Sequence, residues 1–284
     1  MDDDLYELLE PTVPQAAVLV CGLENWIDAG LAGAAAAKRL AAVGTWRTVA
    51  RFDVDLLIDH QARRPTVTYA DGRNEGLSWP SLELAAGTGP DGQAVLLLTG
   101  NEPDRLWRRF GAAVVDLAGR AGVELVVGLG SYPAPAPHTR PTRLVATATS
   151  EALAGRVGFV AGRLEVPAGI GAALEAICGD AGLDAIGLWA QVPHYVANLH
   201  YPAATAALLE GLGRLTGLVY DTSELTAAAT ETGTKIDQLV AQNPEHARMV
   251  TELERLVDAQ LPAGPLPSAD ELAAELERFL RDQG

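Results

Sequence analysis

The alternation of apolar runs with helical segments is the feature that most limits how this chain can fold. Four mainly apolar runs occupy residues 16–21, 94–98, 124–129 and 185–192, and all four end in polar loops. Runs of this kind are typical of strands that are covered on both faces. Helical segments follow three of the four loops, and strands that alternate with helices favour a mainly parallel sheet with right-handed crossovers. We therefore expect a three-layer α/β/α domain.

Two departures from this alternation predict the domain boundaries. Between residues 65 and 92, short alternating pieces separated by glycines indicate a small hairpin inserted at the sheet edge. From residue 221 onward there is no strand signal, and apolar stripes with helical spacing precede a capping box at Ser268. We predict an α/β/α core domain over residues 1–220, with the insert at about 65–92. A helical C-terminal appendage over residues 221–284 should pack on the core or on a neighbouring subunit.

Charge and size narrow the class of partner. The chain of 284 residues is 48% hydrophobic, which is enough for a large core, and it carries 37 acidic against 21 basic side chains. A net charge of -16 argues against nucleic acid and anionic membranes as partners, because there is no basic surplus to displace counterions. The acidic N-terminus lacks the positive charge of a secretory signal, and no apolar run is long enough to span a membrane. We expect a cytoplasmic protein.

The polar loops after the apolar runs hold the candidate site residues. In open parallel sheets, ligands bind outside the carboxyl ends of the strands, so these loops should meet around one cleft. Carboxylates, imidazoles and an arginine in one cleft suit acid-base chemistry or anion binding. The candidate catalytic residues are Glu24, Asp28, His138 and His194, and the candidate ligand-binding residues are Asn25, Trp26, Glu102, Arg140 and Tyr195.

Each candidate also has a structural interpretation. Asp28 precedes an alanine-rich helical segment and is well placed to cap it, while Glu102 lies where an acid favours a helix dipole. Trp26 fits a hydrophobic plug, and Arg140 could tie its loop to a carbonyl or to a carboxylate such as Glu24. His138 is the strongest single candidate, because four prolines in nine residues stiffen its loop.

Several kinds of site are disfavoured by missing motifs. There is no Gly-x-Ser-x-Gly elbow and no phosphate-binding loop ending in lysine, since Lys38 and Lys235 are the only lysines. His194 and His200 are six residues apart, which is not a metal-binding spacing on a helix, so we expect no metal. The sequence Gly169-Ile-Gly171 is a weak match to a dinucleotide-binding loop, and we expect no cofactor.

Several of these loop motifs together resemble the proteasome assembly chaperone family, in its bacterial branch of uncharacterised proteins from GC-rich organisms. The matching stretches are Gly22-Leu-Glu-Asn-Trp-Ile-Asp-Ala-Gly30, Phe52-Asp-Val-Asp55 with Arg63-Arg-Pro65, Leu97-Leu-Thr-Gly-Asn-Glu-Pro-Asp104, Pro137-His-Thr-Arg-Pro141, and Val192-Pro-His-Tyr195 with Tyr201-Pro202. The resemblance covers roughly residues 17–215. It implies a nucleoside phosphorylase-like fold, a homo-oligomer, and a role in assembling the proteasome core.

Two departures qualify what the resemblance implies. Relatives that dock on proteasome rings carry a C-terminal hydrophobic-Tyr-any tail, whereas this chain ends Arg281-Asp-Gln-Gly284. Some relatives are described as ATP-grasp enzymes, yet no glycine-rich loop with a lysine is present.

Our main hypothesis is that the protein is a non-catalytic assembly factor or interaction scaffold with a protein partner. We expect it to be a homo-oligomer, with three subunits as a working number. The alternative is an enzyme or sensor that binds a small anionic or nucleoside-like ligand at the strand ends.

Overall fold

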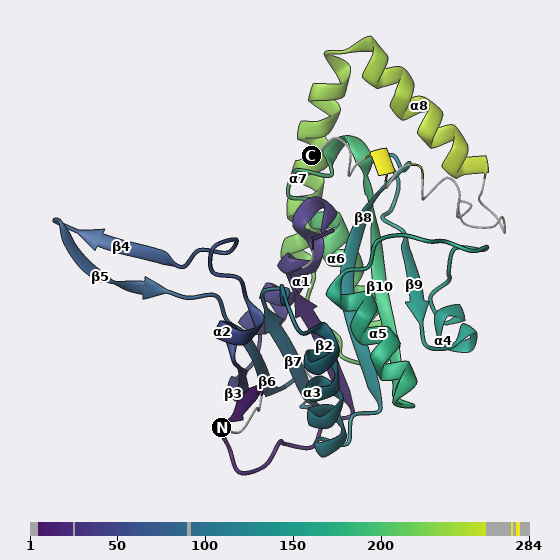
Figure 1. Cartoon of the computed structure of the whole chain (residues 1–284). Coiled ribbons are helices and arrows are strands. Elements are labelled where there is room, and N and C mark those ends of the chain that lie inside the picture. Colours follow the sequence, from purple (N-terminus) through teal and green to yellow (C-terminus); the bar gives the residue numbers. More distant parts are fainter. Residues whose placement is uncertain (1–4, 25, 90–91, 260–273, 275–276, 279–284) are drawn as a thin grey trace.

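The computed structural model describes residues 5–24, 26–89, 92–259, 274 and 277–278 (Figure 1). Its main sheet has eight strands in the order β1-β3-β6-β7-β2-β8-β10-β9. The four central strands, β7 (Ala94–Gly100), β2 (Val18–Leu23), β8 (Leu125–Ala134) and β10 (Asp184–Pro193), are parallel. Antiparallel neighbours extend the sheet on both sides: β6 (Leu82–Thr88), β3 (Trp46–Phe52) and β1 (Tyr6–Leu8) beyond β7, and β9 (Leu144–Ala148) beyond β10.

Helices cover both faces of this sheet. Helices α1 (Ala32–Ala42) and α6 (Pro202–Thr216) pack on one face, where Leu40, Leu188 and Leu208 belong to one buried cluster. Helices α3 (Trp107–Arg120) and α5 (Ile170–Asp180) pack on the other face, around a second cluster that contains Phe52 and Phe110. The predicted three-layer α/β/α architecture with a mainly parallel sheet is therefore confirmed.

Short helical pieces complete the layers. They are α2 (Val54–Leu57), α4 (Glu151–Gly155) and the single turns η1 (Ala29–Leu31) and η2 (His194–Val196).

Small residues let α1 approach the sheet closely. A methyl group on Gly22 of β2 would come within 2.3 Å of the Ala37 Cβ atom on α1, so a larger side chain at Gly22 would push the helix away.

The inserted hairpin is shorter than the sequence predicts. Strands β4 (Thr66–Ala70) and β5 (Arg73–Ser78) form a separate two-stranded sheet that projects from the body of the molecule (Figure 1). The remainder of the range 65–92 includes β6, which pairs with β3 and β7 inside the main sheet. Leu82, Leu84 and Ala86 are the buried residues of β6, so their alternation reflects a sheet face covered by helices rather than a free hairpin.

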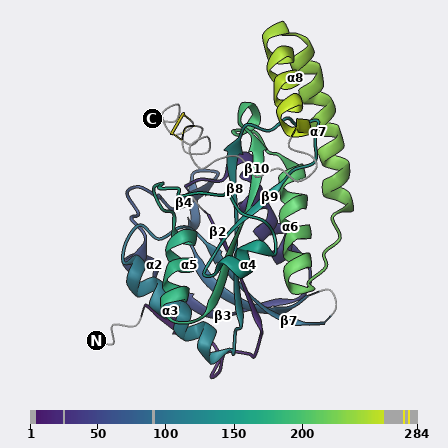
Figure 2. The same cartoon turned by 90° about the vertical axis from the view of Figure 1, so that its right-hand side faces the viewer.

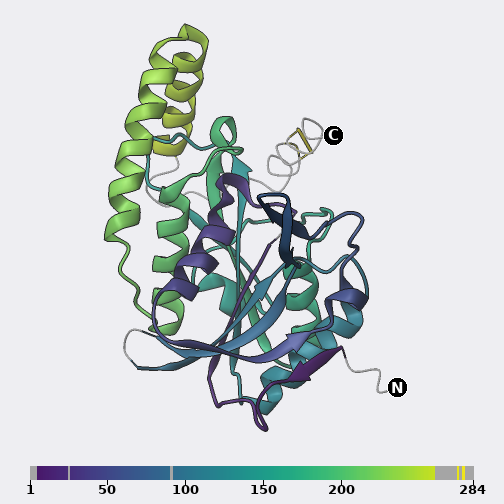
Figure 3. The same cartoon turned by 90° about the vertical axis from the view of Figure 1, so that its left-hand side faces the viewer.

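Two long helices follow the core. Helix α7 (Ser223–Ala241) packs along α6 and buries Ile236, and α8 (Pro244–Ala259) returns beside α7 (Figures 2 and 3). We call this pair the C-terminal helical hairpin. Asn243 accepts a hydrogen bond from the backbone N–H of Glu245 and so caps α8. The predicted helix that opens at Ser268 lies outside the described residues. None of the helices in the described ranges is long and apolar enough to cross a membrane.

Candidate functional site

Three of the polar loops meet at the carboxyl ends of the central strands. The backbone N–H of Gly30, after β2, donates to the Ala197 carbonyl, after β10, at 2.6 Å. The N–H of Tyr201 donates in return to the Gly30 carbonyl at 3.0 Å. The loop after β8 joins the same region because the backbone N–H of His138 donates to the Tyr195 hydroxyl at 2.8 Å. The topology therefore brings these loops to one edge, as the direction of parallel strands requires.

His138 is enclosed, with 2% of its side chain exposed. Its Nδ1 atom lies 2.7 Å from the Tyr195 hydroxyl, and its Nε2 atom lies 2.9 Å from Oδ1 of Asp237 on α7. Since a carboxylate can only accept, Nε2 carries the proton that is donated to Asp237, and in that neutral tautomer Nδ1 accepts the proton of the Tyr195 hydroxyl. Burial raises the pKa of Tyr195, so its hydroxyl stays protonated. Both ring nitrogens of His138 are therefore occupied in bonds between elements.

The two residues after His138 bind the second helix of the C-terminal helical hairpin. Arg140 donates from Nε and from a terminal nitrogen to the two carboxylate oxygens of Asp258, at 2.8 and 2.7 Å. Its other terminal nitrogen lies 3.2 Å from Glu254, which also accepts a bond from the Thr139 hydroxyl. The Arg140 guanidinium holds the pKa of the Asp258 carboxyl below its usual value.

We call His138, Thr139 and Arg140 the His-Thr-Arg anchor. All three side chains bond to the C-terminal helical hairpin, His138 to α7 and the other two to α8. Arg140 does tie its loop to carboxylates, as its structural interpretation predicts. The partners are on α8, however, and the example that the sequence offered, Glu24, is not one of them.

Asp28 caps helix α1. Its two carboxylate oxygens accept the backbone N–H groups of Gly33 and Ala34, at 2.8 and 2.9 Å. The buried Ser131 hydroxyl on β8 donates to the same carboxylate at 2.6 Å. Asp28 thus bonds the start of α1 to β8, and the structure supports its predicted capping role.

Glu102 links two loops to the start of α5. Its carboxylate is 5% exposed and accepts the backbone N–H groups of Ile170, at 2.7 Å, and of Trp26. Burial raises the pKa of this carboxyl, because the surrounding protein solvates its charge less well than water does. The Trp26 ring lies against the backbone of Gly169 with much of its surface exposed, so it is not the buried plug that one interpretation predicts.

The remaining predicted residues lie at the same edge. The Glu24 carboxylate is exposed and accepts a bond from the Asn101 side chain at 2.6 Å. The His194 ring packs edge-on against Tyr195, with 5.3 Å between ring centroids, and its Nδ1 atom lies 3.4 Å from the Ala134 carbonyl. Asn25 lies outside the described residues. The structure thus groups His138, Arg140, His194 and Tyr195 on one side, places Trp26 and Glu102 at the start of α5, and places Glu24 beside Asn101.

One cavity lies beside the His-Thr-Arg anchor and is small. Arg140 and Tyr201 help to line it, and its volume of about 10 Å³ is no more than one water needs. A nucleoside-like ligand does not fit this cavity. A catalytic or ligand-binding role for the predicted residues stays a prediction.

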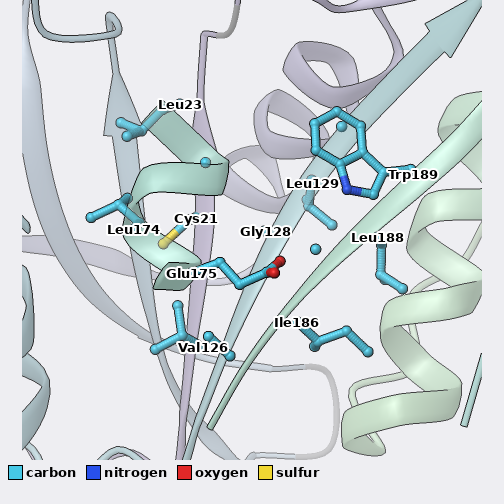
Figure 4. Close-up of a pocket in the computed structure, with 14 residues that line it drawn as sticks. Cys21, Leu23, Val126, Gly128, Leu129, Leu174, Glu175, Ile186, Leu188 and Trp189 are labelled. Carbon is cyan, nitrogen blue, oxygen red and sulfur yellow. The ribbon is translucent and has the colours of Figure 1, made fainter. Parts of the chain in front are cut away.

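One polar cluster was missed by the sequence argument. Figure 4 shows the Glu175 carboxylate pointing into a cavity of about 30 Å³ between α5 and the sheet. Glu175 accepts bonds from the Thr147 hydroxyl, at 2.6 Å, and from the backbone of Gly187, and Trp189 donates to the same hydroxyl at 3.1 Å. Burial raises the pKa of Glu175. The sequence held one signal for this cluster, because Glu175 is the single charged residue in the otherwise apolar first two turns of α5.

The chemistry that these residues offer is limited. No group of three or more His, Cys, Asp or Glu side chains within the described part of the chain is arranged to hold a metal ion. The two cysteines are free and buried, and burial raises the pKa of Cys178 to about 11, so its thiol is not a ready nucleophile. What the geometry shows at the strand ends is a set of bonds that join structural elements.

Comparison with known proteins places the chain among relatives of the same fold. A protein of unknown function from Mycobacterium tuberculosis is 36% identical; the match covers 100% of this chain and 98% of that one, with a TM-score of 0.86. A protein of unknown function from Corynebacterium glutamicum is 31% identical, with 91% and 98% covered and a TM-score of 0.84. A proteasome-assembly chaperone homologue from Mycobacterium tuberculosis is 33% identical, with 82% and 99% covered and a TM-score of 0.76.

Among curated proteins, none matches this sequence. The family model of the PAC2 family matches residues 22–240, which run from the last two residues of β2 through β3–β10 and into α7. The resemblance seen in the loop motifs is thereby confirmed. This chain belongs to the PAC2 family.

Proposed function

We propose that this protein is a non-catalytic assembly factor that acts in the cytoplasm as a homo-oligomer and holds partner proteins. The observation that carries the proposal is the projecting β4–β5 hairpin. Tyr69 is 64% exposed and Trp79, directly after β5, is 52% exposed. Large apolar side chains gathered on one exposed element mark an interaction surface. A two-stranded hairpin alone is only marginally stable in water, so contact with a partner chain would stabilise it.

The register of the hairpin gathers these side chains on one face. Val67 on β4 lies opposite Leu77 on β5, and side chains two residues apart along a strand point the same way. Val67 and Tyr69 therefore share a face of β4, and Leu77 lies on the same face opposite Val67; the register shifts between Thr68 and Tyr69, and Trp79 is the exposed residue that follows β5. We call these four residues the hairpin face.

We propose a second copy of this chain as the occupant of the hairpin face. Residues 64–79 carry two arginines, Arg64 and Arg73, and two acids, Asp71 and Glu75, so this arm has no net charge, whereas the whole chain has a net charge of -16. A neutral arm meets no charge repulsion from the acidic body of another copy, and burial of its exposed apolar side chains would drive self-association. The number of subunits is a quantity to be measured.

The strand ends support a role without catalysis. The His-Thr-Arg anchor uses the histidine and arginine best suited to acid-base or anion chemistry to hold the C-terminal helical hairpin. These hydrogen bonds hold the C-terminal helical hairpin in place on the core, so that its surface keeps a fixed shape to which partner chains can bind.

Relatives suggest the partner. One similar structure bears the description of a proteasome-assembly chaperone homologue, so we propose subunits of the proteasome core as the proteins held. The test mixes purified core α and β subunits of the source organism with the wild-type chain and follows core formation by native gel. Faster core formation, together with co-elution of the chain with a subunit or an intermediate, is expected.

Two variants sharpen this test. Leu77→Asp places a charge on the hairpin face and should slow the assisted reaction, whereas Leu256→Asp on α8 is a control at another exposed leucine. Equal rates with and without the wild-type chain, and no co-elution with any core subunit, would rule out this partner.

A further inference from the structure

A polar pocket of about 380 Å³ lies at the β9 edge of the sheet, remote from the hairpin face. It is bounded by the start of β9, the turn after α4 and the last turns of α6, which Figure 2 shows beside one another. Arg143, Arg156 and Arg214 line it, and the other lining residues are glycine, leucine and valine. We call it the arginine pocket. This lining contains no acidic residue, and since Arg143 has an interaction of its own, Arg156 and Arg214 are the two guanidinium groups whose charge no acid in the pocket balances.

This concentration of positive charge is unusual for a chain with 37 acidic and 21 basic side chains. Arg156 donates one hydrogen bond, to the Leu215 carbonyl at 2.9 Å. Over the described residues, neither Arg156 nor Arg214 forms an ion pair. Since each guanidinium offers five N–H donors and like charges repel, the pocket favours a bound anion.

A purely structural interpretation explains only part of this arrangement. Basic residues stabilise the carboxyl ends of helices, and the bond from Arg156 to Leu215 satisfies a carbonyl in the last turn of α6. The Arg214 guanidinium, however, lies over Gly211, where an added methyl group would be 3.8 Å from its terminal nitrogen, and it forms no ion pair among the described residues.

We propose that the arginine pocket binds a small organic molecule that carries a phosphate or several carboxylates. Guanidinium groups match both kinds of oxyanion through paired hydrogen bonds. The volume is in the range of small-molecule sites and exceeds what inorganic phosphate fills. Leu144, Val157 and Leu215 offer apolar surface for the organic part. This site is separate from the proposed assembly function, because neither the hairpin face nor the His-Thr-Arg anchor contributes to it.

The test is calorimetric titration of the full chain with three probes: pyrophosphate, a nucleoside diphosphate and citrate, at matched ionic strength. At least one probe should bind, and the ranking of citrate against the two phosphates separates carboxylate from phosphate recognition. Arg214→Gln should weaken binding by about tenfold or more, because one charged hydrogen-bonding group is lost. Arg214 is exposed and unpaired within the described residues, so this variant should fold normally.

Arg108→Gln is the matched control, since Arg108 is an exposed helical arginine on α3, on the opposite face of the sheet. It should bind like the wild type, and Arg214→Glu, which inverts the charge, should abolish binding. Absence of binding for all three probes at millimolar concentration would overturn the proposal, as would equal affinities in wild type and Arg214→Glu. Self-association that Arg214→Glu abolishes, with no response to the probes, would overturn it in favour of an acidic segment of a second copy.

Discussion

Glu102 illustrates at the residue scale how polar groups work at these strand ends. Its buried carboxylate accepts backbone N–H groups from two other segments, at Trp26 and Ile170, so one side chain fixes three pieces of chain. Asp28 does the same for α1 and β8. Acidic residues in a cleft therefore need not be acids or bases in a reaction; here they satisfy donors that a helix start would leave unpaired.

The raised pKa of Glu102 predicts a pH-dependent contribution to stability. The folded protein holds this proton more tightly than the unfolded chain, whose carboxyl has an ordinary pKa of 4.5. The stability gained from the group is thus fully present below about pH 4.5 and is lost as the pH rises through the raised pKa. Glutamine does not titrate. The free energy of unfolding of the wild type, minus that of Glu102→Gln, should therefore fall between pH 4 and pH 7.

Urea unfolding of both proteins at several pH values measures this difference. A difference that grows with pH would mean that the hydrogen bonds to the charged carboxylate outweigh its burial.

The role of Asp28 could be predicted from the sequence, whereas for Arg140 the kind of partner could be predicted but not which carboxylates it binds. A helix cap depends on residues a few positions away, so Asp28 before an alanine-rich segment was a sufficient signal. The carboxylates that hold Arg140 are 114 and 118 residues further along the chain. No local pattern encodes such a contact, and a histidine and an arginine in a stiff loop look the same in a catalytic site and in an anchor.

At the element scale, the C-terminal helical hairpin is held to the core by two kinds of contact. Helix α7 packs on α6 through apolar side chains such as Ile236, and the His-Thr-Arg anchor adds polar bonds near the strand ends. The helical character of this region was predictable from its periodicity. Its docking site was not, because the partner surface is assembled from distant segments.

The Arg140–Asp258 pair should couple α8 to the core. We expect a favourable coupling free energy between Arg140→Ala and Asp258→Ala in a double-mutant cycle, because the two side chains are joined by two hydrogen bonds between opposite charges. Hydrogen exchange should show faster exchange in α8 for Arg140→Ala, with little change in α1. Arg255→Ala, which breaks a pair within α8 only, is the control and should leave the attachment intact. Additive effects of the two substitutions would show that the pair does not hold the helix.

At the scale of the whole molecule, the parallel centre of the sheet was predictable and its borders were not. Buried runs followed by helices identify the central strands from local patterns. The positions of β6 and β9 depend on antiparallel pairing with strands whose register is set by long-range contacts. The β4–β5 hairpin was predicted from its turn residues, but not its exposed apolar face, which is also the feature with the largest consequence for function.

Our central claim is that this protein works by presenting surfaces to other chains, first of all to copies of itself through the hairpin face. The direct measurement is the molar mass in solution, by light scattering on an eluting peak, of the wild type and of the double variant Tyr69→Ser and Leu77→Ser. Both residues are exposed, so the variant should fold like the wild type. We predict a multiple of the 29.7 kDa chain mass for the wild type and the single-chain mass for the variant. A single-chain mass for the wild type, or the same multiple for both proteins, would contradict this account.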